Sequence, residues 1–306
     1  MRRLRFFIIL GVLLASVVLS AIGKNDGKVG LDSLRYLWSD TARDADQIGM
    51  RLTRLTDADE MDLGAEVAAP VLAEFHEDPD ASIYVTDVAR SLVPNVRSSG
   101  IQYRFHVIDA AGINAFAMPG GQIFVTSGLL GFVESEAELA AILGHEISHV
   151  DLRHCVERYQ YQYRLKKAGA AALGSMLEFA HRLMIAGFTQ DQETDADSQG
   201  EQLAIEAGYD PDAAAALFER MKAHLGESSS HNANTPVEEV GKAVGDVIGS
   251  YFRTHPPSGD RAVRLKLQVA EHSRDLKGRR FYVGKQNLAQ HIARPRQEFP
   301  SEFRTL

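Results

Sequence analysis

The sequence predicts an α+β protein, mostly helical, with a small mixed sheet beside the helix that carries an H-E-x-x-H motif at residues 145–149. Three observations support this fold class. Apolar residues recur at three- and four-residue steps over most of the chain, which is typical of amphipathic helices. Three short segments between residues 104 and 126 have the alternation and β-rich composition of strands. A helix-capping pattern, Ser135-x-x-Glu138, precedes the motif.

Periodicity and turn residues divide the chain into elements in order. Helical spacing predicts an N-terminal helical segment within residues 24–58, then helices at about 61–75 and 83–92. Strands are predicted at 104–108, 114–118 and 122–126, the last two joined by a Pro-Gly-Gly turn. From Ser135 one continuous helix is expected to about Glu157, followed by mostly helical sequence and a mobile polar loop at about 226–249.

Composition narrows the class of protein and of functional site. The 306 residues are 45% hydrophobic and 24% charged, as in an ordinary globular protein. Lys and Arg total 33 against 41 Asp and Glu, and this net charge of -8 argues against nucleic-acid binding through a basic face. The single cysteine, Cys155, excludes an intrachain disulfide and a metal cluster built only from cysteines.

The N-terminus has the pattern of an export signal. Three arginines within the first five residues precede an uncharged, apolar run from Phe6 to Ile22. Such a run after a positive segment is typical of a secretory signal peptide, and its length also approaches that of a membrane span. Residues 1–23 are thus either a cleaved signal peptide, which the small residues Ala21 and Gly23 favour, or a retained membrane anchor. We expect an exported chain, periplasmic or anchored facing the periplasm.

The C-terminal segment, residues 276–306, is basic, with seven Lys or Arg residues and two Glu, whereas the body of the chain is acidic. Three interpretations are open for this tail. It folds back on the acidic body, it contacts anionic lipid or a partner, or it is solvated. The last is favoured slightly, because charged termini are usually solvated.

The H-E-x-x-H motif predicts a metal site. His145 and His149 are four residues apart, so their imidazoles lie on one helical face and reach the same ion. Glu146 lies at the flank of that face, where it is placed to act as general base on a water molecule. The alternative, two histidines hydrogen-bonded at a helix surface, is disfavoured because the capping pattern and apolar periodicity place the motif on a packed helix.

A third ligand is expected from an E-x-x-x-D pattern at residues 193–197. Catalytic zinc sites use three protein ligands and keep the fourth position open. Glu193 and Asp197 share a helical face, so Glu193 is the candidate ligand and Asp197 the candidate acceptor of a hydrogen bond from a ligand imidazole. Acidic pairs at this spacing are usually solvated, so the prediction depends on the H-E-x-x-H motif.

Further motifs occur in a fixed order around these residues. In chain order they are N-A-F-A-M-P-G-G at 114–121, G-L-L at 128–130, E-L-A at 138–140, R-H at 153–154, E-x-x-x-D at 193–197 and T-H-P-P at 254–257. With them the chain resembles the HtpX/Oma-type gluzincin metallopeptidases, peptidase family M48, over about residues 61–270. The resemblance implies a zincin-like fold for a domain over residues 59–275, one Zn²⁺ per chain, and metalloendopeptidase activity.

The resemblance also implies a biological role. Integral-membrane relatives have several spanning segments, whereas no uninterrupted apolar run follows residue 23 here. The chain therefore resembles the soluble, exported branch of the family, and we expect it to degrade misfolded or unassembled proteins of the cell envelope. The alternative is a chaperone-like, self-inhibited quality-control factor that binds polypeptides in the same cleft.

Substrate contacts are likewise implied by the resemblance. Residues 114–118 match the family's edge strand beside the metal, so Asn114, Ala115 and Phe116 are expected to bind extended substrate by strand addition. Main-chain pairing makes few demands on sequence, which favours unfolded or misfolded polypeptides as partners. Arg261 matches a family arginine that either binds substrate carbonyls or anchors its own segment through a salt bridge.

His255 has three open interpretations. It stabilises the oxyanion of the reaction as a catalytic residue, it is a transient fourth metal ligand that blocks the site, or it is a surface residue before the Pro-Pro pair. The first is favoured.

Overall fold

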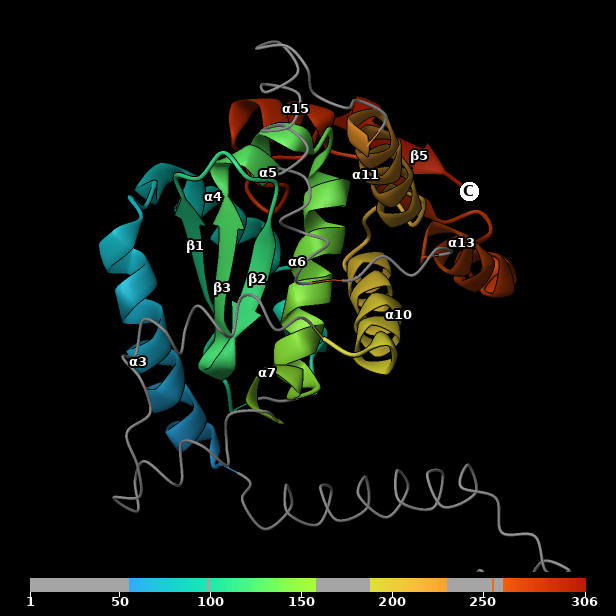
Figure 1. Cartoon of the computed structure of the whole chain (residues 1–306). Coiled ribbons are helices and arrows are strands. Elements are labelled where there is room, and N and C mark those ends of the chain that lie inside the picture. The colour runs from blue at the N-terminus through green and yellow to red at the C-terminus, as the bar shows by residue number, and fades with distance from the viewer. Residues whose placement is uncertain (1–54, 98–99, 158–187, 230–254, 256–260) are drawn as a thin grey trace, which may run out of the picture. The chain divides into compact units, whose positions relative to one another are not determined.

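The computed structural model describes residues 55–97, 100–157, 188–229, 255 and 261–306, without the side chains of 224–229 (Figure 1). Residues 55–306 form one compact unit. The other unit, residues 1–54, lies outside the described part, as do the predicted signal or anchor, the N-terminal helical segment up to residue 54 and residues 230–249 of the predicted loop. None of the helices in the described part is long and apolar enough to cross a membrane.

The described helices lie on both sides of a small sheet, and Figure 1 shows α3, the sheet, α6, α10 and α13 in that order across the molecule. In chain order the helices are α3 (Asp57–Glu74), α4 (Pro79–Ala89), α5 (Ser127–Phe132), α6 (Glu136–Asp151), α7 (His154–Glu157), α10 (Gln190–Glu206), α11 (Ala213–Ser229), α13 (Arg261–Glu271), α14 (Ser273–Leu276) and α15 (Lys285–Gln290). Short 3-10 turns are η1 (Val93–Asn95), η2 (Pro119–Gly121) and η3 (Pro300–Glu302). The prediction of a mostly helical α+β fold is confirmed.

All three predicted strands form one mixed sheet: β1 (Arg104–Ile108), β2 (Ala115–Met118) and β3 (Gln122–Thr126). Their order is β1-β3-β2, with β1 parallel and β2 antiparallel to β3. The turn between β2 and β3 requires glycine, because Gly120 and Gly121 have φ values of 70° and 81°. A Cβ on Gly120 would also lie 2.5 Å from the carbonyl oxygen of Glu60 in α3.

The two faces of the sheet pack on different helices, as the two-residue period of a strand requires. On β3, Ile123 and Val125 belong to the main core, which includes residues of α4 and α6. Phe124 points to the opposite face, where it stacks on Phe116 and joins a second core with Leu63 of α3. The predicted helices before the sheet are confirmed, and each begins one turn earlier than expected because Thr56 and Asp78 provide their N-caps.

The motif helix α6 is buried along its whole length and ends earlier than the sequence indicated. Ser135 Oγ accepts a hydrogen bond from Glu138 N (3.2 Å), as the capping pattern predicts. The expectation of one continuous helix to Glu157 is wrong. The chain breaks at Arg153, whose φ is 63°, a left-handed conformation that costs about 1–2 kcal/mol for a residue other than glycine. Its guanidinium forms ion pairs with Asp57 and Glu60 of α3, which favour this turn.

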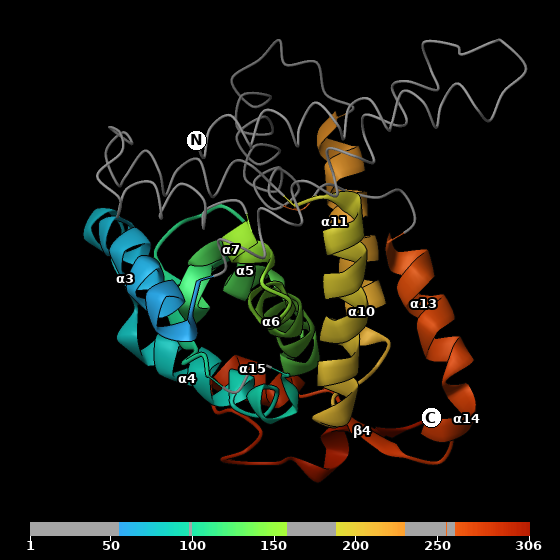
Figure 2. The same cartoon turned by 90° about the horizontal axis from the view of Figure 1, so that it is seen from below.

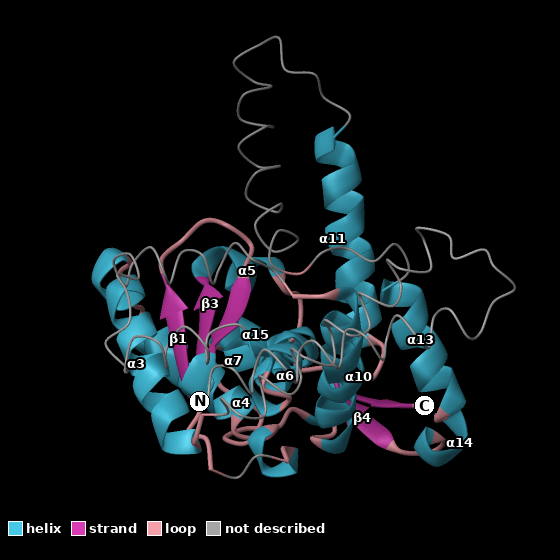
Figure 3. Cartoon of the chain, turned by 60° about the horizontal axis from the view of Figure 1, so that its bottom comes forward, coloured by secondary structure: helices cyan, strands magenta, loops and turns pink. Residues whose placement is uncertain are grey.

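Helices α6 and α10 cross at two glycines, and α10 lies between α6 and α13 (Figures 2 and 3). A Cβ on Gly144 would lie 2.6 Å from the carbonyl oxygen of Gly200, and a Cβ on Gly200 would lie 2.6 Å from the amide nitrogen of His145. Only glycine therefore permits this backbone contact. The crossing holds α10, which carries Glu193, against the helix with both motif histidines.

The C-terminal segment folds onto the domain, so the favoured interpretation of a solvated tail is wrong. Its strands β4 (Arg280–Tyr282) and β5 (Phe303–Thr305) pair antiparallel, and Phe281 and Tyr282 are fully buried. Glu136, at the start of α6, accepts hydrogen bonds from the Arg294 amide (2.9 Å) and from the hydroxyls of Tyr209 (2.9 Å) and Tyr84 (3.1 Å). These apolar and polar contacts outweigh the solvation of the segment's surface charges.

Candidate metal centre

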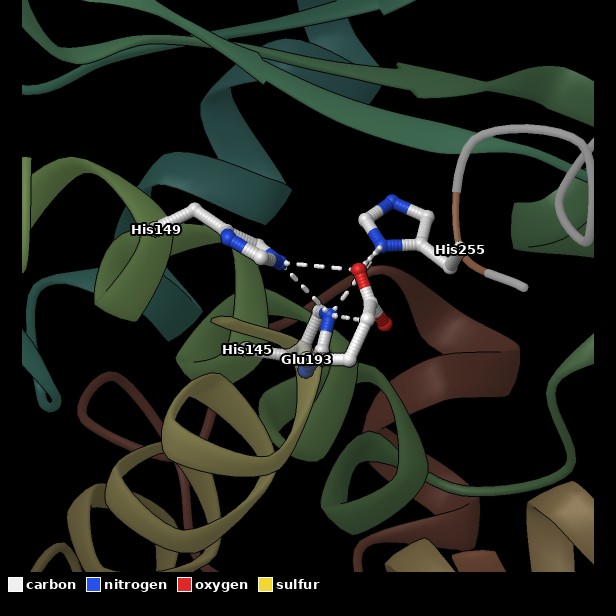
Figure 4. A group of neighbouring side chains, drawn as sticks. All are labelled: His145, His149, Glu193 and His255. Atoms are coloured by element: carbon white, nitrogen blue, oxygen red, sulfur yellow. Dashed lines mark hydrogen bonds and ion pairs between the residues drawn. The ribbon is translucent and has the colours of Figure 1, made fainter. Parts of the chain in front are cut away.

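Four buried side chains converge between α6 and α10 (Figure 4). His145 and His149 extend from α6, Glu193 from the first turn of α10, and His255 from the chain before α13. One ligand atom from each of them lies within 4.8 Å of those of the other three. The structure thus brings together the three predicted ligands and adds His255 to them.

The distances between these atoms fit a tetrahedral metal ion. His145 Nε2 lies 3.0 Å from His149 Nε2 and 3.2 Å from His255 Nδ1. Glu193 Oε1 lies 3.0 Å from His255 Nδ1 and 3.5 Å from His149 Nε2. Ligands about 2.0–2.1 Å from an ion such as zinc stand about 3.3–3.4 Å apart in a regular tetrahedron. Three imidazoles and one carboxylate at this spacing therefore form a set that suits one ion.

The protonation states also suit a metal. Burial lowers the pKa of His149 well below its ordinary value, which favours the neutral imidazole that coordinates metals. Burial alone would raise the pKa of Glu193, but the adjacent His255, His149 and His145 lower it below its usual range, so that Glu193 is a carboxylate. Both groups are in the form that binds a cation.

Glu146 lies beside this set and is fully buried. Neither of its carboxylate oxygens has a hydrogen-bond partner in the described part of the chain, and Oε1 lies 3.3 Å from His255 Nε2. A buried carboxylate without a donor is costly. Its retention next to the ligands indicates that it acts on a group that binds there.

Behind His145 lies a charged pair. Asp197 Oδ1 is 3.1 Å from His145 Nδ1, the arrangement expected from the sequence. Arg261 Nε donates to the same oxygen (2.8 Å), and its guanidinium lies 4.1 Å from the centre of the Phe218 ring. Burial opposes ionisation of Asp197, but Arg261 lowers its pKa below the ordinary value. Arg261 is 4% exposed and bound to Asp197, so the structure favours its anchoring role over contact with substrate.

Behind His149 lie two side chains to which the sequence gave no role at the metal. His154 Nδ1 is 3.0 Å from His149 Nδ1, and the Phe188 ring stacks on His149 with a centroid distance of 3.6 Å. Burial lowers the pKa of His154 to about 4, so the ring is neutral. The sequence showed His154 in its R-H motif and Phe188 before a helix cap at Thr189, but neither signal indicates which ring they contact.

Comparison with known proteins identifies the family. The sequence model of peptidase family M48 matches residues 79–269, the span that contains the four converging side chains. The chain belongs to peptidase family M48. M48 relatives include the mitochondrial metalloendopeptidase OMA1 of Schizosaccharomyces pombe, 30% identical over 214 residues, which are 68% of this chain and 58% of that protein. The beta-barrel assembly-enhancing protease of Escherichia coli K12 is 32% identical over 167 residues, 49% of this chain and 34% of that protein.

The M48 chain thus spans between a third and three fifths of the length of these relatives. Its match to the family includes the H-E-x-x-H helix, the E-x-x-x-D helix and the segment around His255.

The predicted substrate segment of this M48 chain is an edge strand. On its other side β2 pairs with no strand in the part of the chain that the structure describes. The carbonyl of Asn114 accepts a hydrogen bond from Thr126 N (3.0 Å), so the main chain of Asn114 and, two residues on, of Phe116 faces β3. The main-chain groups of Ala115 and Ala117 alternate with these and point to the free edge.

Of the three residues expected to contact substrate, only Ala115 therefore offers main-chain groups to an added strand. The Phe116 side chain packs in the core with Phe124. The Asn114 side-chain oxygen is buried without a hydrogen-bond partner among the residues described. Ala117 is the second position of the free edge, and the sequence reading did not name it.

Proposed function

We propose that this chain is a zinc-dependent metalloendopeptidase. The observation that carries the proposal is the convergence of His145, His149 and Glu193 at tetrahedral spacing beside the unbonded carboxylate of Glu146. Three ligands and an adjacent general base are the parts of a hydrolytic zinc site. Membership of peptidase family M48 supports a peptide as substrate.

In this mechanism bound zinc supplies Lewis-acid polarisation of the scissile carbonyl. The chain supplies the proton transfers: Glu146 takes a proton from the attacking water and returns it to the leaving amine. Asp197 accepts a hydrogen bond from His145 Nδ1 and so keeps Nε2 of this ring directed at the metal. An extended substrate adds to the free edge of β2 through the main chain of Ala115 and Ala117.

His255 occupies the fourth ligand position in the proposed resting state. Its surface interpretation is wrong, because the side chain is 0% exposed. The position of Nδ1, 3.0 Å from Glu193 Oε1, favours a blocking ligand over an oxyanion stabiliser, which would stand where the substrate carbonyl lies and not within the ligand set. We propose that His255 leaves this position when substrate binds, so that the enzyme inhibits itself until then.

The proposed substrates are misfolded or unassembled polypeptides of the cell envelope. Recognition through a strand edge selects extended chain and makes few demands on side chains. The N-terminal charge pattern supports export to the periplasm, and the E. coli relative's name links that protein to beta-barrel assembly. The chaperone-like alternative is supported by His255, since a permanently blocked ion would leave only the binding edge functional.

Cleavage of fluorescent casein by the purified full chain tests the proposal. We expect activity with about one equivalent of zinc, its loss on chelation, and a decrease of at least about 10²-fold in Glu146→Gln with zinc still bound. Glu206→Gln, an exposed change at the end of α10, is the matched control and should leave the rate unchanged.

The His255→Ala variant separates the enzyme from the binder. If His255 blocks the metal, its removal raises the basal rate of casein cleavage. A wild-type chain and a His255→Ala variant that both bind zinc, yet cleave nothing, would refute the peptidase and favour the chaperone-like function.

A further inference from the structure

The two motif histidines have different partners behind them. His145 Nδ1 faces a carboxylate, Asp197, at 3.1 Å, and this carboxylate is paired with Arg261. His149 Nδ1 faces a second imidazole, His154 Nδ1, at 3.0 Å. Both contacts are buried, so each is a hydrogen bond within the protein and not one shared with solvent.

The metal side of His149 decides which ring donates. Its Nε2 points into the ligand set, 3.0 Å from His145 Nε2, and must keep its lone pair to bind an ion. The proton of this neutral ring is then on Nδ1, which donates to His154 Nδ1. His154 is therefore the acceptor, with its own proton on Nε2.

We infer that His154 is a positioning residue, which accepts the Nδ1 proton of His149 and so fixes the tautomer and orientation of this ligand. The inference rests on the zinc site of the proposed function. It assigns to a histidine outside the H-E-x-x-H motif the part that Asp197 plays for His145.

Two features of the fold hold His154 in place for this role. The left-handed turn at Arg153 ends α6, and Glu60 of α3 pairs with the Arg153 guanidinium at 2.8 Å, so that the next residue turns back along the helix end toward His149. The Phe188 ring covers the face of the His149 ring, with an interplanar angle of 14°. Stacking restrains the tilt of the ligand ring, and His154 restrains its rotation in the plane.

Three substitutions at His154 test the acceptor. The asparagine Oδ1 lies where the histidine Nδ1 lies, whereas a glutamine amide reaches the position of Nε2, and leucine has no acceptor. We expect His154→Gln and His154→Leu to weaken zinc binding by about 10–100-fold and His154→Asn by less than about threefold. The readout is zinc affinity by competition with a chromophoric chelator, on the full chain, together with the visible spectrum of the cobalt form.

Controls separate this role from folding and from the proposed function. His106, which bonds Glu77 and Gln122 at 3.0 Å each, is a remote histidine, and His106→Asn should leave zinc affinity unchanged. A wild-type chain that binds no zinc refutes the proposed function. A wild-type chain that binds zinc as tightly as His154→Leu and His154→Gln refutes only the role of His154. Equal losses in Asn, Gln and Leu, or loss of far-UV circular dichroism in all three metal-free variants, would make His154 a packing residue and overturn the inference.

Discussion

Two glutamates on α10 show how surroundings decide the protonation of a buried carboxyl. Glu193 meets three imidazoles and has a lowered pKa despite its burial. Glu201, two turns along the same helix, is also buried, and neither oxygen has a hydrogen-bond partner in the described chain. Burial, then the charges of Asp197 and Asp212, raise its pKa to about 8. One carboxyl is therefore ionised for binding and the other is neutral at physiological pH.

Glu201 should make the stability of the protein depend on pH. Its folded pKa, about 8, is above the ordinary value of 4.5, so the folded state holds the proton more tightly. The free energy of unfolding then falls as pH rises from about 4.5 through 8, because ionising Glu201 penalises only the folded chain. We expect Glu201→Gln to raise this free energy by up to about 4 kcal/mol more at pH 9 than at pH 5.

Urea unfolding at the two pH values measures the difference. Glu206→Gln on the same helix is the matched exposed control and should give no pH-dependent gain. An equal effect of Glu201→Gln at both pH values would show that Glu201 is ionised in the fold.

At the scale of elements, the site depends on how closely α6 and α10 approach. Neither helix alone holds the ligands, because two come from α6 and one from α10. Glycine in a helix interior costs about 1 kcal/mol relative to alanine, so Gly144 and Gly200 are retained against local preference. Their backbone contact, with no room for a Cβ on either side, is the reason.

Gly144→Ala should damage the metal site. The added Cβ would lie 2.6 Å from the Gly200 carbonyl oxygen, so the helices must separate and move Glu193 away from the histidines. Overpacking of about 1–3 kcal/mol exceeds the gain in helix propensity, so we expect a net loss of stability and weaker zinc binding. Thermal unfolding and chelator competition measure the two effects.

The matched control is Gly131→Ala in α5, where a Cβ meets nothing within 4 Å. It should be neutral or stabilising with unchanged zinc affinity. A Gly144→Ala protein that binds zinc like the wild type would mean that the crossing does not set the ligand positions.

At the scale of the whole molecule, the C-terminal segment is part of the catalytic domain. It ends on the strand pair β4–β5 and reaches the buried carboxylate of Glu136 at the start of α6. Tyr282 is fully buried, and its hydroxyl donates to Asn287 Oδ1 (2.6 Å) and accepts from the Phe299 amide (2.8 Å). The segment therefore supports the helix that carries the metal ligands.

Tyr282→Ala should destabilise the whole domain. Removing a fully buried aromatic side chain costs about 3–5 kcal/mol, and two hydrogen-bond partners lose theirs. Lys277→Ala, an exposed change in the same segment, should shift the free energy of unfolding by less than about 0.5 kcal/mol. Urea unfolding followed by circular dichroism checks both, and equal small effects would mean that the segment is dispensable.

Local patterns in the sequence were sufficient for the strands, the motif helix and the ligands. The alternation of residues 122–126 depends only on the two-residue period of a strand, and the spacing of His145 and His149 only on the helical turn. The cap at Ser135 is a contact between neighbours in the chain. The E-x-x-x-D pattern placed Glu193 and Asp197 on one face for the same reason.

Only the tertiary structure decided the features that depend on residues far apart in the chain. Arg153 breaks the motif helix because its ion-pair partners are in α3, and the basic segment is folded because its apolar residues meet α6 and α11 contacts that charge counting ignores. His255 joins the ligands and Arg261 turns to Asp197 through contacts that span more than sixty residues. Sequence periodicity reports the direction of a side chain from its own element, whereas its partner is chosen by the packing of elements.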